Sequence, residues 1–375
     1  MRRTIRRTLV LAAGLLWVGL ACLPALAAGS LEIGAAAPDF SLPGVDGKTY
    51  TLESFRDAEI LVVIFTCNHC PTSQAYEDRI KQLAADYKDK KVALVAISPN
   101  DPEAVRPDEL GYSDLGDSLE DMKVRARDNA FNFPYLYDGE TQKASRAYGP
   151  VATPHVFVFD KARKLRYAGR IDSSERPDKV TTRETRDAIE ALLAGRAVLV
   201  ETTKAFGCST KWSDKRASAR KWLEDCAKEP VDLKPIDEAA VRALAKNDGR
   251  KARLIAVWVS DGVSSVEALS ELVTMNRMYR NRNFEMVTIA ADAPAAKDKV
   301  LETLKATQAS ATNYIFGGGD KEKLLKAVDE KPGGGALPHV ILVAPGGEVL
   351  YRQAGAVDPL ALKKAIVGYV GRTYK

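Results

Sequence analysis

The chain alternates between continuous apolar runs and stretches in which apolar residues recur at every third or fourth position. Residues 60–67 (ILVVIFTC) are almost entirely apolar and β-branched, which predicts a strand buried on both faces. Residues 71–90 repeat apolar side chains at spacings of three and four after Pro71, as an amphipathic helix with proline in its first turn does. A second apolar run follows at residues 92–100. This order of strand, helix and strand favours a parallel pair joined by a right-handed crossover.

Flanking segments extend this unit on both sides. Before it, an Asp-Gly pair at positions 46 and 47 separates two short runs of strand character and predicts a β-hairpin. After it come a predicted helix at residues 118–130, a short strand and a short helix. Residues 149–172 then predict two strands joined by a tight turn. Thr153-Pro154 is expected at the start of the first of these strands, because a proline has no N–H to donate and is tolerated at the first position of a strand.

The second half of the chain repeats this pattern. Residues 153–167 (TPHVFVFDKARKLRY) are echoed by residues 337–351 (LPHVILVAPGGEVLY). Residues 61–71 (LVVIFTCNHCP) are echoed by residues 254–264 (LIAVWVSDGVS), which again precede an amphipathic helix and a strand. The sequence therefore predicts an α/β protein in which one fold, a central mixed β-sheet flanked by helices, is used twice in tandem.

The two copies differ in their chemistry. At the aligned positions Cys67 is replaced by Ser260 and Cys70 by Val263, so the second copy lacks this pair of thiols. We expect a first domain at residues 28–200 that carries the chemistry and a second at residues 251–375 that serves in binding or docking. Between them, residues 201–250 predict a lysine-rich connecting segment that contains two cysteines and a helix from about Ser213 to Ala227.

The first 27 residues have the pattern of an export signal, with a basic start, an apolar stretch and small residues at the end. Four of its arginines account for most of the formal net charge of +5, so the remaining chain is close to neutral. Such a balance gives no reason to expect a nucleic acid partner. We expect a periplasmic or otherwise exported protein with no stable membrane span once the signal is cleaved. In that oxidising compartment all four remaining cysteines can pair.

Cys67 and Cys70 lie three positions apart where a buried strand turns into a helix. This spacing brings both sulfurs to one side of the first helical turn, close enough to form a disulfide. The unpaired N–H groups and the positive dipole end of the helix favour a thiolate. We expect Cys67 to be the more stabilised, attacking sulfur and Cys70 to be the resolving thiol. His69 either lowers the pKa of Cys67 or is an exposed loop residue without an electronic role.

These residues resemble the thioredoxin fold, and APDF ahead of TCNHCP is similar to the redoxin branch, the AhpC/TSA-type thioredoxin-like superfamily. The resemblance covers residues 35 to about 195 and implies a thiol-disulfide oxidoreductase that exchanges disulfides with protein thiols and an unknown redox partner. It also implies that the Thr153-Pro154 bond is cis and forms the substrate-binding edge. The second half resembles a degenerate thioredoxin-like domain. No cofactor and no metal ion are expected.

Two departures from the family pattern leave alternatives open. The chain has Thr66 before the first cysteine, where thioredoxins commonly have tryptophan, and it has Leu61 where they commonly have a buried aspartate, so the proton acceptor for Cys70 is not identified. The peroxiredoxin pattern Pro-x-x-x-Thr-x-x-Cys is absent, although Cys70-Pro71-Thr72 is similar to the residues that follow a peroxidatic cysteine. Thiol peroxidase activity is therefore an alternative function.

Two further alternatives concern the same cysteine pair. A purely structural disulfide would close too short a loop to stabilise the fold much. A soft copper site made of Cys67, Cys70 and His155 would resemble chaperones of the Sco type. However, His155 recurs as His339 in the copy without these cysteines, and Sco-type chaperones separate their two cysteines by three residues.

The remaining cysteines, Cys208 and Cys226, flank the predicted helix of the connecting segment. In an exported chain their simplest interpretation is a structural disulfide. The alternative is that Cys208, near Lys211 and Lys215, relays electrons to or from the first pair.

Overall fold

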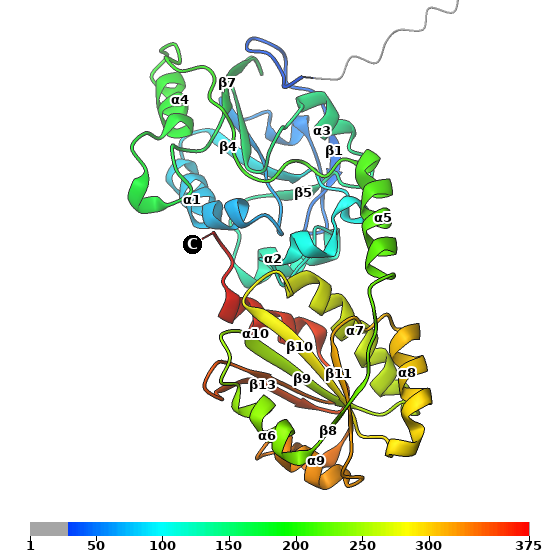
Figure 1. The fold of residues 1–375 in the computed structure, drawn as a ribbon. Coiled ribbons are helices and arrows are strands. Elements are labelled where there is room, and N and C mark those ends of the chain that lie inside the picture. The colour runs from blue at the N-terminus through cyan, green and yellow to red at the C-terminus, as the bar shows by residue number, and fades with distance from the viewer. Residues whose placement is uncertain (1–28, 375) are drawn as a thin grey trace, which may run out of the picture.

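Two α/β domains follow one another along the chain, with helix α5 (Arg216–Cys226) beside their junction (Figure 1). The computed structural model describes residues 29–374, so the predicted signal at residues 1–27 lies outside the described residues. Within that part of the chain, no helix is both long enough and apolar enough to cross a membrane.

The N-terminal domain is built on a five-stranded sheet with the strand order β5-β4-β3-β6-β7. Strands β3, β4 and β5 are parallel, whereas β6 and β7 run antiparallel to their neighbours. The predicted hairpin and the buried strand at residues 60–67 are both confirmed. The strand bounds are β1 (Ser41–Pro43), β2 (Thr49–Thr51), β3 (Ile60–Phe65), β4 (Val92–Ser98), β5 (Tyr135–Tyr137), β6 (His155–Phe159) and β7 (Leu165–Gly169).

Hydrophobic clusters cover both faces of this sheet, because alternate side chains of β3 point to opposite sides. One cluster joins the sheet to α1 (Pro71–Tyr87), α2 (Leu119–Asp128) and α4 (Glu184–Leu193). The other joins it to the hairpin and to α3 (Lys143–Tyr148). A strand buried on both faces must be apolar throughout, which is why residues 60–65 form a continuous apolar run.

The C-terminal domain repeats this topology. Its sheet has the order β13-β12-β9-β10-β11-β8, and without β8 this matches the first sheet strand for strand. The Thr153-Pro154 and Leu337-Pro338 bonds, which precede β6 and β12, are both cis. The prediction of one fold used twice is thus confirmed. The strand bounds are β8 (Lys234–Ile236), β9 (Ala252–Trp258), β10 (Phe284–Ala290), β11 (Thr312–Phe316), β12 (His339–Val343) and β13 (Val349–Ala354).

Helices cover both faces of the second sheet as well. One apolar cluster joins the sheet to α7 (Val263–Tyr279), α8 (Lys297–Ala306) and α10 (Pro359–Val370). The opposite cluster contains α6 (Glu238–Lys246) and α9 (Lys321–Val328). Short 3-10 helices lie at Leu52–Phe55, Pro102–Ala104, Pro107–Leu110, Pro177–Lys179, Ser213–Lys215, Pro294–Ala296 and Gly333–Gly335.

The segment predicted as a connector at residues 201–250 is divided between the two domains. Its first part lies on the N-terminal domain, where Thr202 pairs with Ala168 and Cys208 pairs with Thr153. Its predicted helix is confirmed as α5 (Arg216–Cys226), and its last part supplies β8 and α6 to the C-terminal domain.

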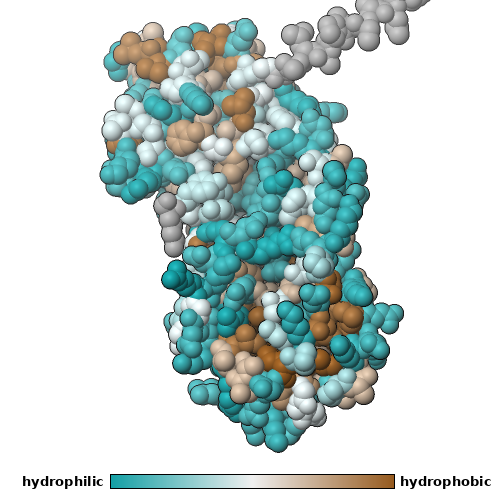
Figure 2. Space-filling model, viewed as in Figure 1, coloured by the Kyte–Doolittle hydropathy of each residue, from teal (hydrophilic) through white to brown (hydrophobic). Residues whose placement is uncertain are grey.

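Hydrogen bonds and ion pairs hold the two domains together. The Tyr279 hydroxyl donates to the Ser113 carbonyl at 2.8 Å, and Arg282 donates to the Gly111 carbonyl at 2.6 Å. After α10, the chain crosses to the N-terminal domain, where Arg372 donates to the two carboxylate oxygens of the buried Asp114 at 2.6 and 2.9 Å. Hydrophilic side chains dominate the surface around this junction in the view of Figure 2.

We expect the Arg372→Ala substitution to lower the free energy of unfolding by roughly 1–3 kcal/mol, because it leaves the buried Asp114 carboxylate without its bidentate partner. The matched control is Lys364→Ala, which removes the more exposed interdomain pair with Asp128 and is expected to cost less than about 1 kcal/mol. Urea denaturation of the full chain measures both values. Equal losses would contradict this account of the junction.

Candidate functional site

The cysteine pair lies in the turn between β3 and α1. Helix α1 begins at Pro71, and Cys70 is its N-cap residue, with its sulfur accepting a hydrogen bond from the Ser73 N–H at 3.5 Å. Cys67 lies three residues before the cap. The expectation that Cys67 is the sulfur favoured by the helix terminus is therefore wrong, because the N–H groups of the first turn point at the N-cap side chain.

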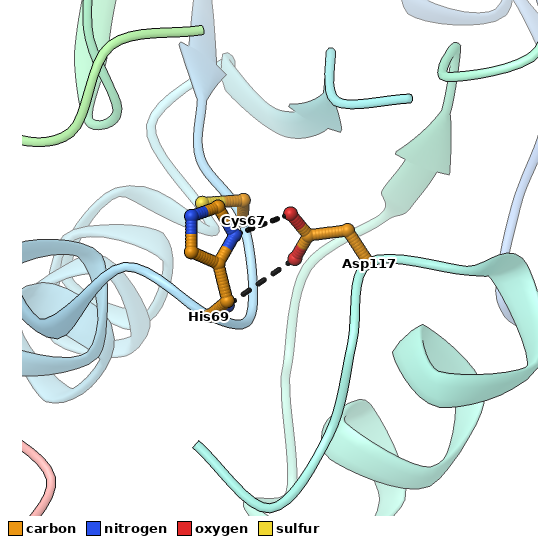
Figure 3. A group of neighbouring side chains, drawn as sticks. All are labelled: Cys67, His69 and Asp117. Atoms are coloured by element: carbon orange, nitrogen blue, oxygen red, sulfur yellow. Dashed lines mark hydrogen bonds and ion pairs between the residues drawn. The ribbon is translucent and has the colours of Figure 1, made fainter. Parts of the chain in front are cut away.

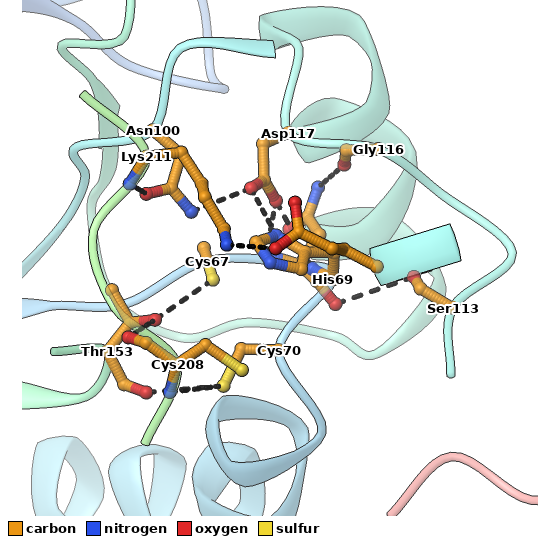
Figure 4. Close-up of polar contacts among 12 residues, drawn as sticks. Cys67, His69, Cys70, Asn100, Ser113, Gly116, Asp117, Thr153, Cys208 and Lys211 are labelled. Atoms are coloured by element: carbon orange, nitrogen blue, oxygen red, sulfur yellow. Dashed lines mark hydrogen bonds and ion pairs between the residues drawn. The ribbon is translucent and has the colours of Figure 1, made fainter. Parts of the chain in front are cut away.

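Thr153 contacts both sulfurs from the loop that enters β6. Its Oγ1 shares a hydrogen bond with the Cys67 sulfur at 3.2 Å, and its carbonyl oxygen accepts one from the Cys70 sulfur at 3.3 Å. Both cysteines are free thiols, with only 3% of Cys67 and 0% of Cys70 exposed. Figure 4 shows the two side chains on either side of the strand-to-helix turn, facing Thr153. The structure therefore brings together Cys67, Cys70 and Thr153, as the sequence predicts.

His69 is buried and forms an ion pair, so the interpretation of an exposed loop residue is wrong. Its Nδ1 lies 2.5 Å from an Asp117 carboxylate oxygen (Figure 3). Asp117 also accepts the Asn68 N–H at 2.9 Å and the Asn100 side-chain amide at 2.8 Å. These bonds hold a carboxylate of the loop that precedes α2 against the backbone of the cysteine turn.

The ion pair keeps two opposite charges in the protein interior. Burial lowers the pKa of His69, but the Asp117 carboxylate outweighs burial and leaves that pKa raised. Burial raises the pKa of Asp117, whereas His69 and the neighbouring N–H donors reverse this and hold that pKa below its usual value. Both shifts favour the charged form of the pair, with an imidazolium on His69 and a carboxylate on Asp117.

The two thiols are shifted in opposite directions. Burial raises the pKa of Cys70, yet hydrogen bonds from Cys208 and Cys67 and the charge of His69 bring it well below the ordinary value. Burial raises the pKa of Cys67 well above the ordinary value, and the Cys70 and Asp117 charges raise it further. The two shifts therefore favour a thiolate on Cys70 over one on Cys67. His69 tunes the pKa of Cys70 rather than that of Cys67.

Cys208 belongs to this site and not to a disulfide with Cys226. Its backbone N–H points at the Cys70 sulfur from 3.3 Å, and its carbonyl accepts the Thr153 N–H at 2.9 Å. Cys226, a free thiol at the far end of α5, instead accepts a hydrogen bond from Arg280 at 3.5 Å. The 11 residues of α5 extend about 16 Å along its axis, so this helix carries Cys226 away from the site.

The backbone edge at Thr153-Pro154 is covered by the chain itself. Cys208 pairs with Thr153 as an isolated antiparallel bridge, and both Thr153 and Pro154 are buried. Gly207 makes this approach possible, since a Cβ atom there would lie 2.0 Å from the Thr153 carbonyl oxygen and its φ of +141° favours glycine. The predicted substrate-binding edge is therefore occupied by residues 207 and 208 in this structure.

The C-terminal tail reaches the same region. Tyr374 stacks edge-on against Tyr112 at a centroid distance of 5.1 Å. It also lines an open pocket together with Thr72, Glu175 and Gly207. Tyr374, which follows the second domain, thus lies near the cysteines of the first domain.

The copper-binding alternative with His155 is not supported by the geometry. His155 lies at the start of β6, where its Nδ1 accepts the Val151 N–H at 3.3 Å and burial lowers its pKa to about 4. Among the described residues, the group whose ligand atoms lie within 4.8 Å of one another consists of Cys67, His69 and Asp117. In that group the imidazole and the carboxylate already bond each other, so two of its ligand atoms are not free for an ion.

Sequence reasoning missed Asp117 and Asn100. Neither residue belongs to a recognisable motif, and Asp117 lies 48 positions from His69 along the chain. The sequence contains one indirect indication. Leu61 stands where thioredoxins commonly have a buried aspartate, so a carboxylate near the cysteines would have to come from another part of the chain.

The corresponding position in the second domain carries different side chains. Ser260 donates its hydroxyl to Asp292 at 2.6 Å, and Val263, the counterpart of Cys70, is 74% exposed. The prediction that the second copy cannot perform thiol chemistry at this position is therefore confirmed.

Comparison with known proteins identifies the first domain. The AhpC/TSA family model matches residues 33–168. Alkyl hydroperoxide reductase E of Mycobacterium tuberculosis is 28% identical over 172 residues, which are 44% of this chain and 99% of that protein. The N-terminal domain is thus similar to the AhpC/TSA family over residues 33–168. This redoxin domain is an oxidoreductase of the thioredoxin-like superfamily.

Two solved structures are similar to the redoxin domain. An uncharacterized conserved protein from Geobacillus kaustophilus is 37% identical and covers 48% of this chain and 93% of its own length, with a TM-score of 0.44. A hypothetical protein from Sinorhizobium meliloti is 34% identical and covers 49% of this chain and 97% of its own length, with a TM-score of 0.44.

We expect the Asp117→Asn substitution to move the two thiol pKa values in opposite directions. His69 loses its counter-ion and its charge, so the pKa of Cys70 rises, while the pKa of Cys67 falls because a nearby negative charge is gone. The Cys70 thiolate then gains its proton at a higher pH than in the wild type. Carbon-13 NMR titration of labelled cysteines measures both values.

The control for this substitution is Asp128→Asn, the same chemical change at the surface end of α2, which is expected to move neither thiol pKa. Shifts of both thiol pKa values in the same direction in Asp117→Asn would contradict this description of the site.

Proposed function

We propose that this chain is an exported thiol-disulfide oxidoreductase that cycles between a Cys67–Cys70 dithiol and disulfide and acts on protein thiols or disulfides. The observation that carries the proposal is the Cys70 sulfur at the N-cap of α1, beside the imidazolium of His69. A thiolate is the nucleophile of disulfide exchange. Support for export comes from the signal pattern in residues 1–27.

In the proposed reaction the Cys70 thiolate attacks a substrate disulfide, and a mixed disulfide forms while one substrate thiol leaves. The Cys67 sulfur then attacks Cys70, forms the Cys67–Cys70 disulfide and releases the second substrate thiol. Cys67 must lose its proton in this step. The Thr153 hydroxyl lies 3.2 Å from the Cys67 sulfur and can accept a hydrogen bond from this thiol, but a hydroxyl is not a strong base. We therefore expect proton loss from Cys67 to limit the rate.

The low pKa of Cys70 has a consequence for the direction of exchange. A stabilised thiolate favours the reduced form of the pair, which raises its reduction potential and makes the disulfide a stronger oxidant. Since the folded pKa of Cys70 lies below the ordinary value, this stabilisation is present at neutral pH and is lost as the pH falls through the folded pKa.

Thiol peroxidase activity is the second candidate. It is favoured by the similarity to alkyl hydroperoxide reductase E and by the buried thiolate that directly precedes Pro71. In that reaction Cys70 would attack a peroxide oxygen, the O–O bond would break, and an alcohol or water would leave while Cys70 becomes a sulfenic acid. A second thiol would then convert the sulfenic acid to a disulfide with release of water.

We expect Cys70→Ser to slow the dithiothreitol-driven reduction of a disulfide-bonded protein by roughly a hundredfold or more, because the attacking sulfur is removed. A variant that combines Cys67→Ser with Cys208→Ser should accumulate the mixed disulfide with the substrate, because no second thiol is left beside Cys70, and non-reducing mass spectrometry detects it. Cys226→Ser is the matched control and should retain wild-type activity.

A peroxide-consumption assay on the same variants separates the two candidates. Rapid peroxide turnover by a wild-type protein that fails to reduce protein disulfides would replace the proposed function with the peroxidase. Full disulfide-reducing activity of Cys70→Ser would refute both.

A further inference from the structure

The buried position of the cysteine pair raises a question of access. Cys67 and Cys70 are almost completely buried, and the backbone edge beside them is covered by residues 207 and 208. A thiol on another protein therefore has no direct approach to either sulfur in this conformation. Any exchange with a macromolecule needs either a large movement or an intermediate carrier.

Cys208 has the position that such a carrier would need. It lies in antiparallel pairing with Thr153, as an extended peptide would at an open edge, and its N–H points at the Cys70 sulfur. Unlike the buried pair, Cys208 is partly exposed. It thus contacts Cys70 on one side and solvent on the other.

The surrounding bonds fix Cys208 in this place. The neighbouring Lys211 donates its backbone N–H to the Asn100 side chain at 2.8 Å, and its carbonyl accepts the Asp101 N–H at 3.0 Å. The Lys211 ammonium is itself paired with Glu109. The close approach at Gly207, which no other residue type permits without displacement, brings the segment against Thr153. These contacts hold the segment that carries Cys208 in a fixed position against Thr153 and Cys70.

We propose that Cys208 is a third redox cysteine, which exchanges a disulfide with Cys70 and carries it from the buried pair to the surface. This inference rests on the proposed function of the Cys67–Cys70 pair. It assigns to Cys208 a chemical role in place of the structural disulfide with Cys226 that the sequence predicts.

The exchange balances as two reversible steps. In the first, Cys208 loses its proton to solvent and its sulfur attacks Cys70 of the Cys67–Cys70 disulfide. The Cys70–Cys208 bond forms, the Cys67–Cys70 bond breaks, and Cys67 leaves with the electron pair and takes up a proton. In the second, an external dithiol protein attacks Cys208, Cys70 leaves as a thiolate, and the second external thiol releases Cys208. The external dithiol is oxidised and the chain is reduced.

The protonation of Cys208 is consistent with this order of events. The pKa of Cys208 is raised in the reduced protein, mainly by a hydrogen bond with the Cys70 sulfur and to a smaller extent by burial. Cys208 is therefore a protonated thiol in that state. Once Cys70 is part of a disulfide, it no longer carries the negative charge that holds this proton. Cys208 therefore becomes a nucleophile only after the buried pair has been oxidised.

The pocket beside Cys208 provides the place where an external thiol arrives. Gly207 and Tyr374 both line it, and Tyr374 lies against Cys208. The tail of the second domain therefore lies beside Cys208, where an external thiol would react.

The test uses the full-length Cys67→Ser variant, oxidised with one equivalent of diamide and mapped by non-reducing peptide mass spectrometry. We expect a Cys70–Cys208 disulfide as the main linkage, and the same linkage when Cys226→Ser is added as the matched control. A free Cys208, or a linkage of Cys70 to Cys226 or to a second copy of the chain, would overturn the proposal.

A second measurement uses the Cys208→Ser variant, which keeps the buried pair intact. Reduction of its Cys67–Cys70 disulfide by a reduced thioredoxin, used as the probe, should be about tenfold or more slower than in wild type and in Cys226→Ser. Equal rates would overturn the relay while leaving the proposed function in place. If the wild type itself forms no Cys67–Cys70 disulfide under oxidation, the proposed function and the relay both fail.

Discussion

The ion pair between His69 and Asp117 determines the charge state of the candidate site. An isolated carboxylate or imidazolium would be costly in this interior, whereas the pair, supported by N–H donors on Asp117, retains both charges. The cation stabilises a thiolate on Cys70, and the carboxylate disfavours a second thiolate on Cys67. One buried pair thus makes two neighbouring cysteines chemically different.

Several segments that are far apart in the sequence position the residues of this site. The first sheet presents the cysteine turn, and the loop before α2 presents Asp117. The segment after the redoxin domain brings Cys208 against Cys70, and the tail of the second domain brings Tyr374 over Cys208. The second domain, which has Ser260 and Val263 in place of the two thiols at the equivalent turn, therefore contributes to the surroundings of the site without repeating its chemistry.

Most of the fold follows from local sequence signals, because a doubly buried strand and an amphipathic helix each require a characteristic spacing of apolar residues. The errors in the site have different causes. Pro71 occupies the first helical position, so the helix boundary that makes Cys70 the N-cap was present in the sequence. Asp117 contacts His69 across 48 positions and Cys208 contacts Cys70 across 138, so no local pattern shows that His69 is buried in an ion pair or decides between a disulfide and a relay for Cys208.

The central claim is that Cys70, and not Cys67, carries the negative charge in the reduced protein. The most direct test is a site-resolved NMR titration of the wild-type chain with carbon-13-labelled cysteine. The account predicts that the Cys70 signal remains that of a thiolate well below the pH at which an ordinary thiol ionises, while Cys67 stays protonated above it. A lower pKa for Cys67 than for Cys70 would contradict the account.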